Sequence, residues 1–274
     1  MAGYLDIYRE IEIGAPSMGE WTKEPERLPY ALRTRRQWNG MESEARVRMA
    51  QRTFYALSTH VDHQIRAVIG TLRDHGLHDD TVIMLTADHG DMLGSHGLWG
   101  KTLFYEELAK IPMLLVPNAT QADRLGYAGE DGRLAVQADV MPTLLEMSRI
   151  PVPDTVEGLS LVGERRRDYV YGDMYEDARA SRMVRDRCHK LIYYPVGNRT
   201  QLVDMGNDRD ELLDVSEELA YVEARQRLTE FLVDKLYGTD LEWLDGGRLV
   251  GTPESSDAPT PDRGLANQRG YRFR

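Results

Sequence analysis

Three polar residues in the first half of the sequence have types and spacing suited to chemistry. Asp88 and His89 are adjacent, and Lys101 follows further along the same segment. A carboxylate and an imidazole on neighbouring residues can bind one divalent cation. The ammonium group of a nearby lysine would add a second positive charge. A metal ion beside a lysine is suited to a doubly charged oxyanion, either sulfate or phosphate.

The elements that must position these residues are indicated by the sequence around them. A continuous apolar run over residues 81–86 is rich in β-branched residues and too short for most helices. It predicts a buried parallel strand. In open α/β sheets, ligands bind at strand ends of this kind. Gly90 follows directly, and we expect it to let the chain bend sharply after His89.

The surrounding sequence resembles a known family. Residues 86–115, from Thr-Ala-Asp-His-Gly to Ile-Pro-Met-Leu-Leu, resemble the second metal-binding segment of type I sulfatases, in the alkaline phosphatase superfamily. Gln137–Met147 with Gly158 resembles the segment that ends the large sulfatase domain. Met183–Ile192 and Gln201–Met205 resemble its small C-terminal sheet. The resemblance covers most of residues 50–240.

This resemblance implies roles for four residues. Asp88 and His89 match metal ligands, and Lys101 matches the catalytic lysine that contacts the sulfate and the attacking or leaving oxygen. His96 is the second catalytic candidate, either hydrogen bonding to the metal shell from outside or touching the substrate. Taken alone, these residues have simpler interpretations: a strand-ending aspartate, a packed turn histidine and a solvated lysine.

The resemblance also implies cofactors. Calcium (Ca²⁺) is the usual metal of the family, and an imidazole ligand at His89 favours manganese (Mn²⁺) or zinc (Zn²⁺) more than asparagine there would. Sulfatases further use a Cys or Ser in a Cys/Ser-x-Pro-Ser-Arg motif, which is oxidised to formylglycine. The sequence contains no such motif, so formylglycine is absent. Its only cysteine, Cys188, lies in Asp-Arg-Cys-His-Lys, and Ser17 lacks the following arginine.

We therefore expect the C-terminal part of a sulfatase-like protein, in a truncated or split form that is inactive alone. The expected function is metal-dependent hydrolysis of a sulfate ester or a related oxyanion ester. The expected partner is the missing N-terminal half or a second copy of the chain. Two alternatives stay open: a phosphonate or phosphodiester hydrolase of the same superfamily, and a non-catalytic remnant that acts as a binding module.

Composition narrows the remaining function classes. A net charge of −11 over 274 residues argues against nucleic acid as a partner, because such proteins carry basic surfaces. No apolar run reaches the roughly 18 residues of a membrane span, so we expect no membrane association. No signal peptide is evident, which indicates a cytoplasmic protein by default.

The chain is expected to fold as α/β: the C-terminal part of an alkaline phosphatase-like, mostly parallel sheet with flanking helices, plus a small antiparallel C-terminal sheet with a helix. Apolar spacing predicts a helix over residues 54–72 that ends near Gly76, and another over residues 217–236. Asp139 is a candidate N-cap for a helix through Met147. The predicted domains are 1–162, the α/β part; 163–240, the small subdomain; and 241–274, a flexible tail.

Overall fold

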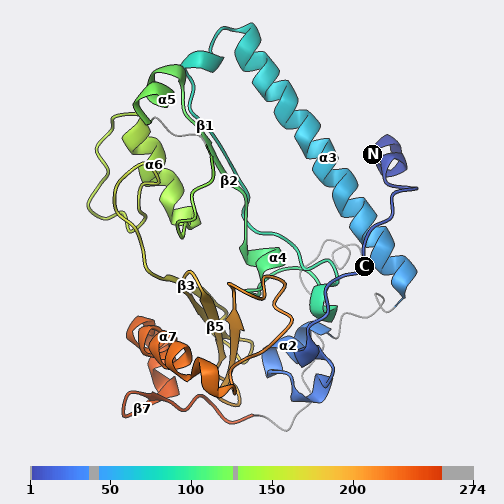
Figure 1. Cartoon of the computed structure of the whole chain (residues 1–274), viewed down its shortest axis with the longest axis vertical. Coiled ribbons are helices and arrows are strands. Elements are labelled where there is room, and N and C mark those ends of the chain that lie inside the picture. Colours follow the sequence, from blue (N-terminus) through green and yellow to red (C-terminus); the bar gives the residue numbers. More distant parts are fainter. Residues whose placement is uncertain (1, 37–42, 126–128, 255–274) are drawn as a thin grey trace, which may run out of the picture. The chain divides into compact units, whose positions relative to one another are not determined.

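The computed structural model describes residues 2–36, 43–125 and 129–254 (Figure 1). The chain divides into two compact units. Unit 1 contains the residues up to Gly14, Arg48–Asp88 and Ile111–Asp168, and unit 2 contains Ala15–Val47, His89–Lys110 and the residues from Tyr169 onward. The segment His89–Lys110 thus belongs with the C-terminal sheet, whereas the sequence suggests that it is part of a continuous α/β domain over residues 1–162.

Unit 1 is built from helices and one pair of strands. Its elements are α1 (Ala2–Ile7), most of α3 (Glu44–Asp74), η3 (His78–Asp80), β1 (Ile83–Thr86), β2 (Met113–Val116), α5 (Ala119–Leu125), η5 (Gln137–Asp139) and α6 (Val140–Met147). No helix in the described ranges is both long and apolar enough to cross a membrane.

Strands β1 and β2 run antiparallel, not parallel as the sequence suggests, with Thr86 opposite Met113 and Ile83 opposite Val116. A parallel neighbour would need a crossover that carries the chain back to the start of β1. Here the intervening segment closes on itself instead, because the Gly90 N–H donates to the Leu108 carbonyl oxygen (2.9 Å). The chain therefore comes back beside the C-terminal end of β1, and β2 runs antiparallel to β1 from there.

The long helix predicted before β1 is present as α3 and begins ten residues earlier (54 − 44 = 10). It ends as predicted near Gly76, whose φ of +66° and the Leu77 N–H bond to the Leu72 oxygen (2.9 Å) form a helix C-terminal turn. Several apolar side chains that predict the helix are exposed, including Val61 at 53% and Val68 at 60%. The apolar face of α3 is therefore largely uncovered in the described chain.

Asp139 does not cap α6 with its side chain, although the helix begins at Val140 and carries Pro142 in its first turn. Its buried carboxylate instead accepts hydrogen bonds from the Val136 and Leu159 N–H groups (both 2.8 Å) and from Arg167 Nη2 (2.7 Å). The carboxylate therefore joins three parts of unit 1, because a buried charge requires several partners.

Unit 2 is centred on the predicted antiparallel sheet, with strand order β3-β4-β5-β6. Its elements are η1 (Glu20–Thr22), η2 (Pro25–Arg27), α2 (Tyr30–Arg36), η4 (Ser95–Gly97), α4 (Glu106–Ala109), β3 (Val170–Met174), β4 (Ser181–Arg185), β5 (His189–Tyr194), β6 (Arg199–Asp204), η6 (Leu219–Tyr221), α7 (Val222–Lys235), η7 (Gly238–Trp243), β7 (Leu244–Asp245) and β8 (Arg248–Leu249).

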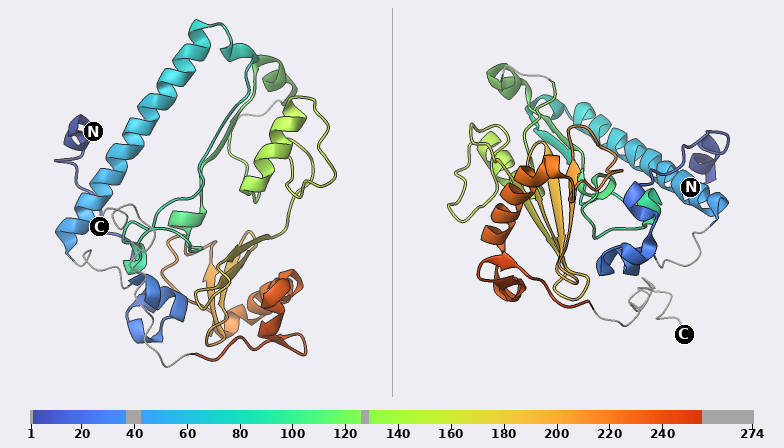
Figure 2. Two further views of the ribbon diagram at one scale, coloured as in Figure 1. Left: turned by 180° about the vertical axis from the view of Figure 1, so that it is seen from behind. Right: turned by 60° about the horizontal axis from the view of Figure 1, so that its bottom comes forward.

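Each face of this sheet forms its own hydrophobic cluster, because side chains alternate along a strand. On one face, Met183 and Ile192 pack with Met92 and Leu98 from the segment His89–Lys110. On the other, residues including Val184, Leu191 and Leu202 pack against Leu228 and Leu232 of α7, which lies along the sheet in Figure 2. Burying each such side chain contributes about 1.5–3 kcal/mol.

The tail predicted to begin at residue 241 is packed on unit 2 as far as Thr252. Trp243 is buried in the second cluster. Beyond the β7–β8 hairpin, the Gly197 N–H donates to the Thr252 oxygen and the Thr252 N–H donates to the Pro195 oxygen (both 2.8 Å). Residues 255–274 of the predicted tail lie outside the described residues.

A buried ion pair also holds this C-terminal segment. Arg182 and Asp240 are each 3% exposed, with Nε–Oδ2 and Nη2–Oδ1 distances of 2.6 and 2.7 Å. Because Asp240→Ala leaves the arginine buried and unpaired, we expect the free energy of unfolding to fall by about 3–5 kcal/mol in urea denaturation. The control Asp234→Ala breaks an exposed pair with Lys235, and we expect a change below about 1 kcal/mol. Equal effects of the two variants would contradict a structural role for the buried pair.

Candidate functional site

The segment that carries His89 and Lys101 is held in one conformation by its own hydrogen bonds and by packing. The Met92 N–H donates to the Gly100 oxygen (3.2 Å), and the Gly94 N–H to the Leu98 oxygen (3.0 Å). Met92 and Leu98 have no solvent exposure. Lys101 itself is exposed, so a rigid loop presents a solvent-accessible ammonium group.

Position 90 needs a glycine because a side chain would not fit there. The expectation that Gly90 uses the backbone freedom of glycine to bend the chain is therefore corrected. The φ of Gly90 is not among the positive values of the described residues. A Cβ atom at this position would lie 2.0 Å from the Glu107 carbonyl oxygen. Any larger residue would therefore push the segment beyond Glu107 away from His89.

The structure brings His89 and Lys101 together. The Lys101 Nζ lies 3.1 Å from His89 Nε2, and His89 Nδ1 lies 2.7 Å from the Gly90 carbonyl oxygen. A carbonyl oxygen only accepts and an ammonium group only donates, so Nδ1 carries the proton and Nε2 offers its lone pair. This tautomer is the one a metal-binding histidine adopts when its other nitrogen is fixed by a backbone carbonyl.

Asp88 directly precedes His89 and lies just beyond the end of β1. Gln137 Nε2 donates to the carbonyl oxygens of both Ala87 (2.9 Å) and Asp88 (2.7 Å). Successive carbonyl groups of a strand point to opposite sides. The carbonyl groups of Ala87 and Asp88 both face one side-chain amide, so the extended backbone ends at Asp88. Sequence reasoning missed Gln137 as a site residue, because a lone glutamine before a helix carries no motif.

The donors at Asp88 and His89 fit a divalent cation. They comprise an exposed carboxylate and an imidazole nitrogen whose lone pair already faces a cation, the Lys101 ammonium at 3.1 Å. Mixed oxygen and imidazole donors suit manganese, zinc or calcium to different degrees. The metal-binding roles of Asp88 and His89 and the oxyanion-binding role of Lys101 remain predictions.

His96 lies elsewhere, in the interior of unit 2. It has no solvent exposure, its Nδ1 accepts a hydrogen bond from the Gly19 N–H (3.1 Å), and its ring contacts Trp21 and Tyr105 at centroid distances of 5.0 and 5.2 Å. Complete burial argues against the predicted contact of His96 with substrate. The geometry supports a role in packing.

His96, Glu107 and Glu211 form a second cluster of metal-ligand types, with ligand atoms within 4.8 Å of one another. Burial lowers the pKa of His96, which favours the neutral ring. Because Nδ1 accepts from the Gly19 N–H, Nε2 carries the proton of that ring and has no lone pair for a metal. The Lys190 ammonium lies 2.7 Å from Glu211 Oε1 and already supplies positive charge there. This cluster therefore fits a cation less well than His89.

The depressed pKa of His96 has a defined effect on stability. The unfolded chain takes up the proton as pH falls through about 6.5, and the folded protein resists it. Stability conferred by the neutral ring is therefore present above that pH and is lost below it. Asn is tolerated at the His96 φ of +56°, and its side-chain oxygen can accept from Gly19. We expect the melting temperature of His96→Asn to fall less steeply than that of the wild type between about pH 7 and about pH 5.

The control for this measurement is His75→Asn, which changes an exposed histidine near the end of α3. We expect this variant to keep the wild-type pH dependence. If the melting temperatures of His96→Asn and the wild type fell equally over this pH range, the buried ring would not titrate differently in the folded and unfolded states.

Comparison with known proteins places the chain in a family. The Sulfatase family model matches residues 23–150, and the model named N-sulphoglucosamine sulphohydrolase, C-terminal, matches residues 94–237, more than half of the chain. An arylsulfatase of Clostridium perfringens is 28% identical over 92% of this chain and 54% of its own length. A choline-sulfatase of Rhizobium meliloti is 28% identical over 88% of this chain and 48% of its own. The chain spans about half the length of these curated relatives.

Solved structures agree on the fold. A phosphonate monoester hydrolase from Silicibacter pomeroyi superimposes with a TM-score of 0.73 at 22% identity, covering 85% of this chain and 52% of that one. The chain therefore belongs to the type I sulfatase family and has the alkaline phosphatase-like α/β fold of that superfamily. A divalent metal is the usual cofactor of this family.

Proposed function

We propose that this chain supplies metal-binding and oxyanion-binding residues of a sulfuric ester hydrolase. The observation that carries the proposal is the 3.1 Å distance from His89 Nε2 to the Lys101 ammonium group, from which we infer that Nε2 offers its lone pair to a cation. Asp88 and His89 would hold the divalent metal, and Lys101 would contact the charged ester group.

Each residue has a distinct chemical task in this proposal. A bound divalent metal withdraws charge from the ester oxygens and supports a deprotonated nucleophile. The Gly90 carbonyl keeps the His89 ring oriented, and Lys101 stabilises negative charge that accumulates on the transferring group. The sequence holds no Cys/Ser-x-Pro-Ser-Arg motif, so the formylglycine nucleophile of this family must come from residues outside this chain.

Hydrolysis of a phosphonate or phosphate ester is the second candidate. The specific observation in its favour is the fold that this chain shares with a phosphonate monoester hydrolase. Because phosphate and sulfate esters share tetrahedral geometry and differ mainly in charge, Asp88, His89 and Lys101 suit both. We propose calcium or manganese as the metal, and the imidazole favours manganese.

Metal binding tests the first part of this proposal. We expect titration calorimetry with MnCl₂ to show a site that weakens at least about tenfold in His89→Ala and in Asp88→Asn, because each removes one ligand. His75→Ala removes an exposed histidine and should leave the affinity unchanged. Unchanged manganese affinity in His89→Ala would place the metal elsewhere.

Oxyanion binding tests the second part without requiring a nucleophile. In the presence of manganese, we expect sodium sulfate to bind the wild type and to bind Lys101→Met at least about tenfold more weakly, since a charged hydrogen bond is lost. Lys110→Met is the control, because Lys110 is also an exposed lysine of the same segment. The same titration with phenylphosphonate separates the two candidate functions. A manganese-loaded chain that binds neither anion would favour the non-catalytic alternative.

A further inference from the structure

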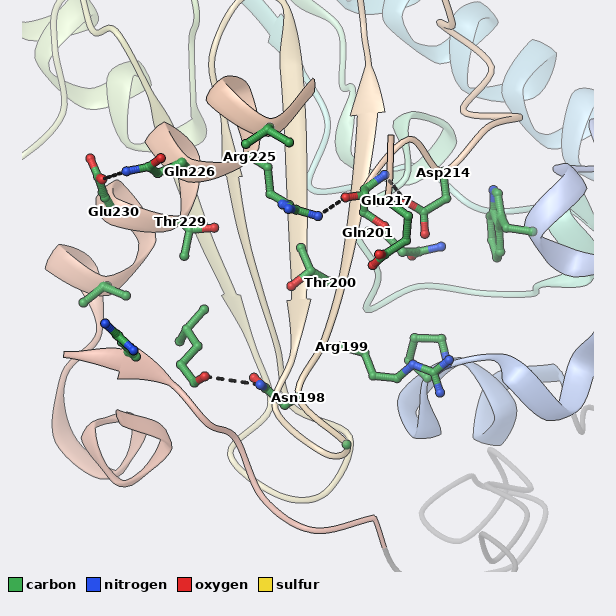
Figure 3. Close-up of a pocket in the computed structure, with 18 of the residues that line it drawn as sticks. Asn198, Arg199, Thr200, Gln201, Asp214, Glu217, Arg225, Gln226, Thr229 and Glu230 are labelled. Carbon is green, nitrogen blue, oxygen red and sulfur yellow. Dashed lines mark hydrogen bonds between the residues drawn. The ribbon is translucent and has the colours of Figure 1, made fainter. Parts of the chain in front are cut away.

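A large groove in unit 2 is lined by residues that the proposed function does not use (Figure 3). Its volume is about 1070 Å³. It is lined by the edge strand β6, by α7, by residues 27–29 and by residues 247–249. Figure 3 shows Arg199, Thr200 and Gln201 in succession on β6, with Arg225 and Thr229 on the neighbouring helix.

The outer edge of β6 supplies backbone groups to this groove. β6 is the last strand of the sheet order, so one of its edges has no neighbouring strand. Leu202 uses its outward N–H and carbonyl for Asp214 Oδ1 (3.1 Å) and the Val215 N–H (2.9 Å). By alternation, Thr200 also directs its N–H and carbonyl outward. Neither group has a partner among the residues that the structure describes.

Gln201 presents a fixed donor to the same groove. Its side chain is 5% exposed, and its Oε1 accepts hydrogen bonds from the hydroxyls of Tyr105 (2.7 Å) and Tyr194 (3.0 Å). Because both acceptor positions of Oε1 are used, the orientation of the carboxamide is fixed and its NH₂ group is left as a donor. Arg199 lies two residues earlier and therefore on the same face of β6.

The groove also concentrates positive charge in a chain whose net charge is −11. Four arginines and three acidic residues line it. In the described part of the chain, Arg199 and Arg248 have no carboxylate partner, and Arg225 donates to the Ser216 carbonyl oxygen. Of the acidic residues, Asp214 is already bonded to two backbone N–H groups. Glu230 accepts a hydrogen bond from Gln226 Nε2 (2.9 Å), and Glu217 is left as an acceptor beside the arginines.

The hydrogen-bonding groups that line the groove indicate the chemical class of its ligand. The arginines, the Thr200 N–H and Gln201 require an anionic acceptor, whereas Glu217 and the Thr200 carbonyl require hydroxyl-type donors. An acidic peptide strand would need a longer open edge, because the Leu202 position is taken by residues 214–215 and residues 195–197 pair with Thr252. A sugar chain with sulfate or carboxylate substituents carries both kinds of group. We propose that this groove binds an acidic oligosaccharide.

This binding site is separate from the residues proposed for metal and ester binding, and it needs no metal. The experiment is fluorescence anisotropy of a labelled chondroitin sulfate octasaccharide with the full chain in buffer containing EDTA. The same octasaccharide after chemical desulfation retains its carboxylates, and an octaglutamate peptide serves as the non-sugar polyanion. Binding of either sugar supports the proposal, and the difference between them identifies the anionic substituent.

We expect Arg199→Ala and Arg248→Ala each to weaken octasaccharide binding about tenfold, because each removes a charged hydrogen bond. Thr200→Pro removes the outward N–H together with the Thr200 hydroxyl; an edge strand tolerates this change, and the variant should also weaken binding. Arg209→Ala is the control, since Arg209 is an exposed arginine of unit 2 outside the groove. Thermal melting of each variant confirms that it is folded.

Three results would overturn the proposal. Equal weakening in Arg209→Ala would show non-specific attraction to arginines, and full binding in both groove variants would show that the groove is not used. Octaglutamate binding as tight as that of the octasaccharide would assign the groove to an acidic peptide. His89→Ala separates this proposal from the proposed function: it should leave octasaccharide binding unchanged, and a loss there would place the sugar at the metal-binding residues.

Discussion

The buried ammonium of Lys190 is the constraint on which the candidate site depends. Lys190 is 1% exposed on β5, and its Nζ lies 2.8 Å from the Phe104 oxygen and 2.7 Å from both Glu106 Oε1 and Glu211 Oε1. An unpaired charge at this depth would cost several kcal/mol. The chain must therefore bring both carboxylates and a carbonyl to β5, and two of these three partners lie in the segment that carries His89 and Lys101.

Glu211 extends this constraint to the N-terminal part of unit 2. Its Oε2 accepts from the Glu106 N–H (2.6 Å), where α4 begins, and its carbonyl oxygen accepts from Trp21 Nε1 (2.9 Å). Its φ of +55° is uncommon for a residue with a side chain and is sustained by these contacts. Apolar packing alone would let the segment slide on the sheet, whereas these directional bonds allow one position.

Local patterns account for what the sequence predicts well. Alternating apolar residues predict the antiparallel sheet, helical spacing predicts α3 and α7, and the family motif predicts that Lys101 returns to His89. The antiparallel pairing of β1 and β2 depends on the Gly90–Leu108 bond, which no local pattern reports. The pairing of Lys190 with Glu211 joins residues far apart in sequence, and a lysine in a strand-like run is ordinarily a surface residue.

His89 and His96 show why residue type within a motif does not decide chemistry. Both rings use Nδ1 for a backbone contact, but His89 meets a carbonyl oxygen and His96 meets an amide N–H. The first contact places the proton on Nδ1 and leaves Nε2 able to bind a cation, whereas the second places the proton on Nε2 and prevents it. The difference arises from the Gly90 carbonyl beside one ring and the Gly19 amide beside the other. One segment can therefore carry, seven residues apart (96 − 89 = 7), a buried packing histidine and a histidine whose Nε2 can accept a cation.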